Sequence, residues 1–302
     1  MTTVATAGLA VLDFVFGVDR RPDRGRKVFA SSLTEVGGGP AANAAVTIAA
    51  LGGDARFVGR IGDDTIGERI LADFARWGVD TSRVRTIEGV PSPLSSVVIE
   101  ADGERTIVNY TDGALFAPDD LITTNDLAGA DTVLADLLWP TGGLSALRTA
   151  AELGVPSVLD FDEVPEQGLT EALTLPTHLV FSAPALAAVA ETAAPAEALL
   201  KIAGRTDAWV AVTLGAKGVL WVDDGVVEHT PAYTVTTVDT LGAGDVYHGA
   251  FALGIAENRG IEDAVMRAAA AAALKCARFG GREGVPTRDE VEDFMKANPR
   301  RT

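Results

Sequence analysis

The residues with the clearest chemical potential form the segment DTLGAGD at positions 239–245, which runs directly into a helical pattern. A turn of small residues that opens a helix leaves backbone N–H groups unpaired, and the helix dipole adds positive potential there. The amides of Gly242, Ala243 and Gly244 therefore form a candidate anion-binding site. Asp245 lies in the first turn, where the dipole favours the ionised form that can take a proton from an alcohol. The combination predicts phosphoryl transfer to a hydroxyl, although a helix-capping turn would also explain this motif taken alone.

A second glycine-rich segment, GGGPAANAAV at positions 37–46, leads into an alanine-rich helical pattern. Gly38 and Gly39 let the backbone approach a ligand closely, and Asn43, one turn into the helix, offers both a donor and an acceptor. Asp13 follows the first apolar run, where its carboxylate can accept hydrogen bonds from two vicinal hydroxyls; a helix or turn cap is the alternative. We expect these four residues to contact a hydroxylated ligand.

The two segments together resemble the paired signatures of the PfkB (ribokinase-like) carbohydrate kinases, in the same order and at the right separation. The resemblance covers nearly the whole chain. It implies an ATP-dependent kinase that transfers the γ-phosphoryl group to a sugar hydroxyl, most simply a primary CH₂OH, with Asp245 as catalytic base. It also implies Mg2+ bridging the ATP phosphates. Asp13, Gly38, Gly39 and Asn43 match the family's sugar-contacting positions.

Of the segments that would bind the nucleotide, one matches the family pattern and one differs from it. TLGAKG follows an apolar run, and the resemblance implies that Thr213, Gly215 and Gly218 border the ATP phosphates and ribose; a tight turn between strands is the alternative. The family also carries an Asn and, three residues on, a Glu that organise magnesium through water. Ser182 and Ala185 stand at these positions here, which leaves the metal-binding residues unknown. Asp160 and Asp162 follow an expected strand, and we hypothesise that one of them binds the water ligands of the metal.

One branch of the family, the bacterial sulfofructose kinases, shares further segments with this chain, including departures such as Ser182. In that branch a Lys and an Asn from a lid and an Arg from the body bind the sulfonate. Lys27 and Asn109 stand at the first two positions, but Leu138 stands at the third. Since a hydrogen bond to a charged group is worth about 1.5–3 kcal/mol, the missing guanidinium would weaken sulfonate binding roughly ten- to a hundredfold. We still expect a ketose-like sugar as the substrate, with sulfofructose ahead of any other single sugar. Fructose, ribose and ketodeoxygluconate are the alternative substrates, and a non-catalytic sugar sensor is the alternative function.

Composition narrows the class of protein. The 302 residues, of which 47% are hydrophobic, can bury one large core. The formal charge of -17 opposes binding to nucleic acid or to an anionic membrane surface, which favours small-molecule ligands. The single cysteine, Cys276, excludes an intramolecular disulfide, and the N-terminus lacks a basic signal-peptide region, so we expect a cytoplasmic protein. The absence of GxxxxGK[ST], and of a GxGxxG turn at Gly8, argues against P-loop kinases and dinucleotide-binding oxidoreductases.

Strand-like and helix-like patterns alternate along the chain and predict an α/β fold. The expected fold is ribokinase-like and doubly wound, a mostly parallel sheet with helices on both faces and ligands at the carboxyl ends of its strands. The clearest expected helices are Thr65–Trp77, Val246–Ala256 and Val265–Cys276. The expected strands of this sheet are Val4–Leu12, Arg56–Gly59, Thr132–Ala135, Ser157–Leu159, Leu179–Phe181 and Trp209–Thr213.

Two regions with period-two alternation predict a separate small antiparallel sheet. They are Lys27–Val36 and Leu94–Tyr110, the latter with a hairpin turn at Asp102-Gly103. We therefore expect one domain over residues 1–302, with lid strands inserted at about 14–36 and 92–112. The family resemblance implies that this sheet is a lid over the sugar and that the protein forms a homodimer through its lid strands.

The histidines give weaker evidence for a functional site. His248 lies one turn after Asp245, where it can either face the sugar or pack behind the site. His178 and His229 form no metal-ligand spacing with Cys276, which we interpret as a core residue.

Overall fold

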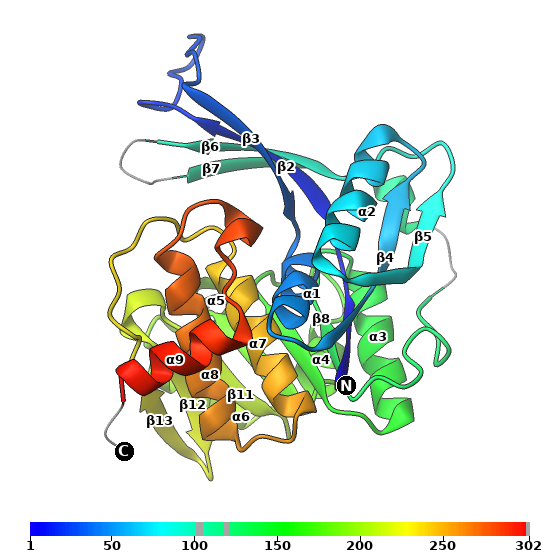
Figure 1. Cartoon of the computed structure of the whole chain (residues 1–302). Helices are drawn as coiled ribbons and strands as arrows, with labels where there is room; N and C mark the ends of the chain where they lie inside the picture. Colours follow the sequence, from blue (N-terminus) through cyan, green and yellow to red (C-terminus); the bar gives the residue numbers. More distant parts are fainter. Residues whose placement is uncertain (101–104, 118–120, 300–302) are drawn as a thin grey trace.

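The main sheet of the computed structural model carries the strands in the order β13-β12-β11-β10-β9-β8-β1-β4-β5 (Figure 1). The structure describes residues 1–100, 105–117 and 121–299. Neighbouring strands are parallel except at one edge, where β12 pairs antiparallel with β11 and β13. The strands are β1 (Thr3–Ala7), β4 (Asp54–Gly62), β5 (Asp80–Ile87), β8 (Thr132–Ala135), β9 (Ser157–Phe161), β10 (His178–Ser182), β11 (Trp209–Thr213), β12 (Val219–Asp223) and β13 (Val226–Thr230).

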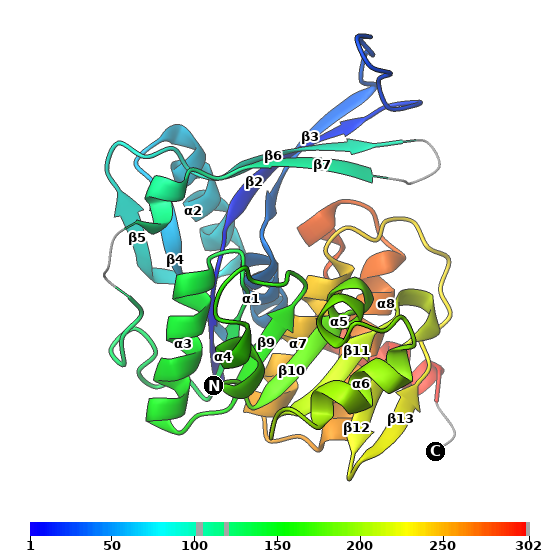
Figure 2. The same ribbon diagram turned by 180° about the vertical axis from the view of Figure 1, so that it is seen from behind.

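Helices cover both faces of this sheet, which confirms the doubly wound α/β prediction. Because side chains alternate along a strand, Val180 packs into the core on one face while Leu179 and Phe181 pack into the core on the other. One face carries α1 (Pro40–Ala50), α2 (Thr65–Trp77), α7 (Ala243–Ala256), α8 (Ile261–Cys276) and α9 (Arg288–Ala297). The other face carries α3 (Pro140–Leu153), α4 (Leu169–Thr174), α5 (Ala183–Ala190) and α6 (Pro195–Ala203) (Figure 2).

A second, four-stranded sheet forms the lid, with the order β3-β2-β6-β7. Its strands are β2 (Val11–Gly17), β3 (Ser32–Gly38), β6 (Leu94–Ile99) and β7 (Arg105–Tyr110). The outer pairs are antiparallel, and a parallel pairing of β2 with β6 joins the two hairpins. Figures 1 and 2 show this sheet above the carboxyl ends of the main strands. The separate small sheet was predicted; the expected turn at Asp102-Gly103 lies outside the described residues.

The first expected strand, Val4–Leu12, was wrong as one element, because the chain leaves the main sheet at Gly8 and enters the lid. The buried carboxylate of Asp136 causes the bend: Leu9 N donates to Asp136 Oδ2 at 3.2 Å. A Cβ at Gly8 would lie 2.2 Å from the same oxygen, so only glycine fits there. Asp13 consequently lies within β2 rather than after a strand.

The expected strand Lys27–Val36 begins only at Ser32. Lys27 lies in the exposed loop that joins β2 to β3, at the end of the lid that projects from the molecule (Figure 1).

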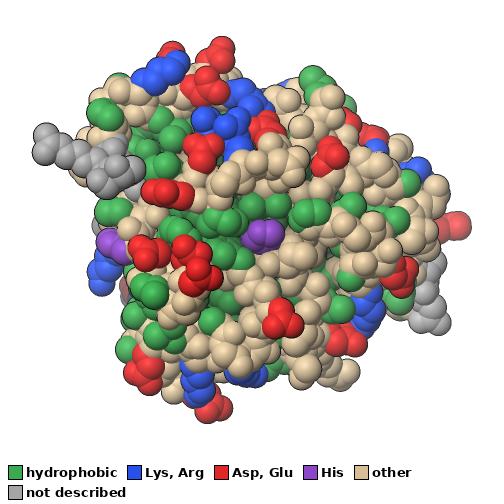
Figure 3. All heavy atoms as spheres, turned by 90° about the horizontal axis from the view of Figure 1, so that it is seen from below, with side chains coloured by type: hydrophobic (Ala, Val, Ile, Leu, Met, Phe, Trp, Pro, Cys, Tyr) green, Lys and Arg blue, Asp and Glu red, His purple; other side chains and the backbone are tan. Residues whose placement is uncertain are grey.

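Within the described residues, no helix combines the length and apolarity needed to cross a bilayer. On the face opposite the lid, hydrophobic side chains gather in a band across the middle, with acidic and basic side chains largely around it (Figure 3).

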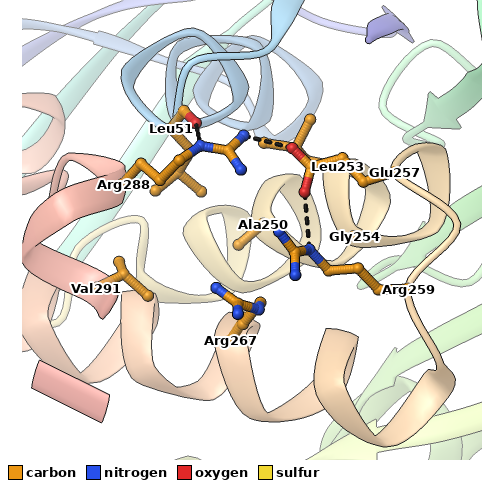
Figure 4. A pocket seen from close by; sticks show the side chains of 9 residues that line it. All are labelled: Leu51, Ala250, Leu253, Gly254, Glu257, Arg259, Arg267, Arg288 and Val291. Carbon is orange, nitrogen blue, oxygen red and sulfur yellow. Dashed lines mark hydrogen bonds and ion pairs between the residues drawn. The ribbon is translucent and has the colours of Figure 1, made fainter. Parts of the chain in front are cut away.

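A polar cluster fastens α9 to α1 and α7 beside a small pocket (Figure 4). Arg288 Nε donates to the Leu51 carbonyl at 2.6 Å, and its Nη2 pairs with Glu257. Arg259 Nε donates to the other oxygen of Glu257 at 2.7 Å. Burial opposes ionisation of Glu257, but these two guanidinium groups outweigh it and lower the pKa. Because these arginines are paired with protein groups, we interpret the cluster as structural.

Candidate active site

The loop at positions 239–245 leads into the N-terminus of α7, as predicted, with helix beginning at Ala243. Gly242 adopts φ 74°, a left-handed conformation that favours glycine. Among the described residues, the amides of Gly242 and Gly244 have no hydrogen-bond acceptor, whereas Ala243 N donates to Thr240 O at 3.2 Å. Two of the three predicted anion-binding amides are therefore free to meet a ligand.

A buried ion pair fixes the start of this loop. Lys275, fully buried, donates from Nζ to Asp239 Oδ2 at 2.9 Å and to Asp239 O at 3.0 Å. The same carboxylate accepts from the amides of Gly280 and Gly281, at 3.1 and 3.2 Å, and from Leu241 at 2.8 Å. Although burial opposes its ionisation, the bond from Lys275 contributes to a lowered pKa for Asp239. This pair holds the loop to the end of α8.

Asp245 is the third residue of α7, and its Oδ2 accepts a 2.6 Å hydrogen bond from Asn43 Nδ2. Burial, and then the negative charge of Asp160, raise the pKa of Asp245 to about 6, although the bond from Asn43 opposes this. The expectation that the helix dipole alone sets the charge state was therefore incomplete. A carboxylate with this pKa is ionised at neutral pH, and its basicity lies nearer the working range of a general base.

Behind Asp245 lies a second buried pair. His248 Nδ1 is 3.1 Å from Asp160 Oδ2, and both side chains are almost inaccessible. Burial disfavours the charged imidazole, but Asp160 outweighs this and raises the pKa of His248. Of the two positions considered for His248, the structure shows the one packed behind the site. Asp162 is exposed at the end of β9.

The segment where the family carries its metal-organising residues has a structural role here. Ser182 caps α5 by accepting from Ala185 N at 3.3 Å, and Ala185 is buried. No group of three or more His, Cys, Asp or Glu side chains within the described ranges is arranged to hold a metal ion. A metal would therefore depend on ATP phosphates and water for most of its ligands.

A small cleft of about 20 Å3 lies between the lid and α7, and Asp13, Asn43 and Gly242 are among the residues that line it. In the lid, Asp13, Ser95 and Asn109 are aligned in one row across β2, β6 and β7. Asn109 Nδ2 donates to Ser95 Oγ at 3.1 Å, and Ser95 in turn bonds to Asp13, whose pKa is raised chiefly by burial. The remaining residues lining the cleft are Gly37, Leu241, Val246, Gly281, Arg282 and Val285.

A larger cavity of about 410 Å3 lies on the other side of the same loop. Thr213, Gly215 and Gly218 all line it, together with Ala243 and Gly244. Its remaining walls come mainly from the chain between β13 and α7 and from one side of α8, through Ala269, Ala272, Ala273 and Cys276. The volume is in the range of sites that bind small molecules.

Comparison with known proteins identifies the family. The model of the pfkB family of carbohydrate kinases matches residues 1–288. This chain belongs to that family. It is an ATP-dependent carbohydrate kinase, and the non-catalytic sensor considered from the sequence is set aside.

Individual relatives agree with this assignment over almost their whole length. The ribokinase of Bacillus subtilis is 30% identical over 316 residues, covering 98% of this chain and 100% of that protein. A solved structure from Agrobacterium tumefaciens, described as a candidate ribokinase, is 38% identical, with a TM-score of 0.95 and coverage of 100% and 99%. The Arabidopsis thaliana ribokinase complexed with ribose and ATP is 25% identical, with a TM-score of 0.86 and coverage of 98% and 99%.

The pfkB kinase site contains residues that the sequence analysis missed or misread. Arg282 and Lys275 are buried cations whose partners lie far away in the sequence. Cys276, interpreted as a core residue, is part of the larger cavity. The run of six alanines from position 268 was read only as a packing pattern; small side chains on one side of it leave room for that cavity.

The three consecutive glycines of the kinase signature have separate steric reasons. A Cβ at Gly37 would lie 2.0 Å from Arg282 Nη1, and one at Gly38 would lie 2.3 Å from Asp13 Oδ2. Gly39 adopts φ 93°, and its Cβ would lie 2.1 Å from the Leu9 carbonyl oxygen. At Gly38 and Gly39, where the sequence suggested close approach of a ligand, the space beside the Cα is therefore occupied by protein groups.

Gly39→Ala is expected to destabilise the kinase by at least about 1–3 kcal/mol, because it combines a left-handed backbone with overlap on Leu9. Urea unfolding should show a lower midpoint at an unchanged m-value. Gly52→Ala is the matched control, since Gly52 has φ 80° but only a 3.6 Å contact. Equal losses in both variants would show that overlap with Leu9 is unimportant.

Proposed function

We propose that this kinase phosphorylates a primary hydroxyl of a neutral sugar, with Asp245 as the base. The observation that carries the proposal is that one loop lines both cavities. Leu241 and Gly242 belong to the cleft with Asp13, whereas Ala243 and Gly244 belong to the larger cavity. The cleft, at about 20 Å3, would have to widen by movement of the lid to admit a sugar. A sugar bound there and a nucleotide in the larger cavity would meet at this loop.

The proposed reaction uses groups that converge there. The sugar hydroxyl attacks the γ-phosphorus in line and transfers its proton to Asp245. The free amides of Gly242 and Gly244 stabilise negative charge on the moving phosphoryl group. Arg105 of the lid donates to Thr240 Oγ1 at 2.8 Å, so the lid already contacts this loop and can exclude water from the reaction.

The charges in the cleft support a neutral sugar over an anionic one. Arg282 is surrounded by the carboxylates of Asp73, Asp13 and Asp245, so its positive charge is already compensated. Of the residues aligned with sulfonate-binding positions, Lys27 is exposed in the lid loop and Leu138 has no charge. Ribokinases among the relatives favour a ribose-like substrate, and a fructokinase is also similar to this chain.

An ADP-release screen tests the substrate class. Ribose, fructose, ketodeoxygluconate and sulfofructose should be compared by kcat/KM at equal ATP and Mg2+. We expect ribose or fructose to exceed sulfofructose by at least about tenfold, the low end of the effect of one missing charged hydrogen bond. A preference for sulfofructose would contradict the neutral-sugar proposal but leave the kinase assignment intact. No turnover with any sugar or fructose phosphate would contradict the proposed reaction.

For magnesium, we propose that Asp160 accepts a hydrogen bond from a water of the ion. Its Oδ1 is buried and has no hydrogen-bond partner among the described residues. When bound, Mg2+ would neutralise charge on the ATP phosphates. Asp160→Asn should raise the Mg2+ concentration for half-maximal rate by about tenfold or more, as loss of outer ligands commonly does. The exposed neighbour variant Asp162→Asn is the control, and an unchanged requirement in Asp160→Asn would rule out this role.

We also propose that the kinase acts in the cytoplasm as a homodimer whose contact is the outer face of the lid. Leu33, Val108 and Tyr110 are 57%, 66% and 50% exposed, and the strand register places them on the face opposite Asp13. Exposed apolar side chains gathered on one face are typical of protein interfaces. Light scattering at micromolar protein should give twice the 31.3 kDa chain mass, and a monomer would count against the proposal.

A further inference from the structure

Arg282 is buried beside the proposed base, and each of its nitrogens contacts a different element. The side chain belongs to the short helix Gly281–Gly284 and is 4% exposed. Its Nε donates to Asn43 Oδ1 at 2.8 Å, and its Nη2 donates to the Gly38 carbonyl at 3.1 Å. Its Nη1 forms an ion pair with Asp73 of α2. The guanidinium also lies 5.2 Å from the centre of the Phe74 ring.

These contacts fix which way the Asn43 amide points. A guanidinium can only donate hydrogen bonds and a carboxylate can only accept them, whereas an amide has one end of each kind. With Arg282 on one side, the Asn43 oxygen must face it, and Nδ2 then donates to Asp245 Oδ2 at 2.6 Å. The reversed amide would set donor against donor and acceptor against acceptor.

We infer that Arg282 is a positioning residue for phosphoryl transfer, which acts through Asn43 to hold Asp245 in place and ionised. The inference rests on the proposed role of Asp245 as base. Arg282 is anchored by Asp73 and Gly38, so its position does not depend on bound sugar. Gly37 has no side chain because one would occupy the place of this guanidinium.

The charged groups around Asp245 explain why the hydrogen bond from Asn43 matters for its ionisation. Its other charged neighbours are Asp160 and Asp162, which oppose its ionisation, and His248, which favours it. Asp13 also interacts electrostatically with Arg282. Because Asn43 donates the hydrogen bond to the buried carboxylate, loss of its orientation would leave the repulsion from Asp160 less opposed.

Arg282→Met tests the inference through kcat, its pH dependence and the KM for ATP. We expect kcat at pH 7 to fall about ten- to a hundredfold, as for loss of a hydrogen bond to a charged group. The acidic limb of the kcat profile should move to higher pH, while the KM for ATP stays within about twofold because Arg282 does not line the nucleotide cavity. Arg278→Met is the matched control, because Arg278 pairs with the exposed Glu290 outside the site.

Two further variants keep the outcome interpretable. If Arg282→Met does not fold, the double variant Asp73→Asn/Arg282→Met also removes the carboxylate that has lost one of its two arginine partners, since only Arg76 would still pair with it among the described residues, and should show the same kinetic changes. A wild-type kcat, or a lower kcat without a shift of the acidic limb, would overturn the positioning role. Asp245→Asn, measured in parallel, separates the two claims: full turnover in that variant would refute the base itself, not Arg282 alone.

Discussion

Asp245→Asn should lower kcat by about 10²–10⁴-fold, the usual contribution of a positioned general base, while the protein stays folded and binds both substrates. The amide has nearly the shape of the carboxylate, and its oxygen can still accept the hydrogen bond from Asn43. It cannot take the proton of the attacking hydroxyl. Coupled ADP release gives kcat, and calorimetric titration gives the affinities for sugar and for ATP.

A lower kcat counts as loss of the base only if those affinities and the thermal unfolding midpoint remain near the wild-type values. The pH profile supplies a second check. Asp245 must be ionised to act, and burial together with Asp160 raises its pKa to about 6. The kcat/KM, which reports the free enzyme, should therefore fall as pH decreases through about 6, rather than near the ordinary pKa of aspartate. A kcat close to wild type in Asp245→Asn would contradict the proposed mechanism.

Lys275→Met should destabilise the fold by about 3–5 kcal/mol, the usual effect of removing one partner of a buried ion pair. The substitution leaves Asp239 without its ammonium partner, in a position where, of the residues that the structure describes, only the amides of Gly280, Gly281 and Leu241 still donate to it. Denaturant unfolding measures the loss. Turnover should also fall, because this carboxylate holds the loop that lines both cavities.

The double variant Asp239→Asn/Lys275→Met is the control for the charge argument. Removing both charges takes away the unpaired buried carboxylate, so the double variant should be more stable than Lys275→Met alone. A loss below about 1 kcal/mol in Lys275→Met would be typical of an exposed ion pair and would contradict the buried one described here.

The sequence predicted those parts of the site whose signals are local. A turn of small residues that opens a helix sets the backbone of Gly242 and the place of Asp245 without help from distant residues. Thr213, Gly215 and Gly218 came from the family resemblance rather than from a local signal, and the structure places all three at the larger cavity. The main sheet also followed from local patterns, because runs of apolar residues alternate with amphipathic helices.

Residues whose roles depend on distant partners were not predicted from the sequence. Arg282 contacts Asn43 and Asp73, which lie more than two hundred positions away in the sequence. The residues next to Arg282 in the chain do not form a pattern that predicts a buried side chain. Asp136 is similar: it accepts from the amides of Leu9, Ala41 and Leu138, and burial raises its pKa to about 7.

That three-way contact with Asp136 also explains why the first strand was predicted as one piece. The apolar run from Val4 to Leu12 carries no turn signal strong enough to show that its middle bends around the carboxylate of Asp136, which directly follows β8.

The most direct test of the central claim is a crystal structure with ribose, or the sugar preferred in the screen, and a non-hydrolysable ATP analogue. We predict that the acceptor hydroxyl lies about 2.6–3.2 Å from a carboxylate oxygen of Asp245, with the γ-phosphate analogue against the amides of Gly242 and Gly244. The opposite result would be a hydroxyl that contacts a different base while Asp245 is turned away from both ligands.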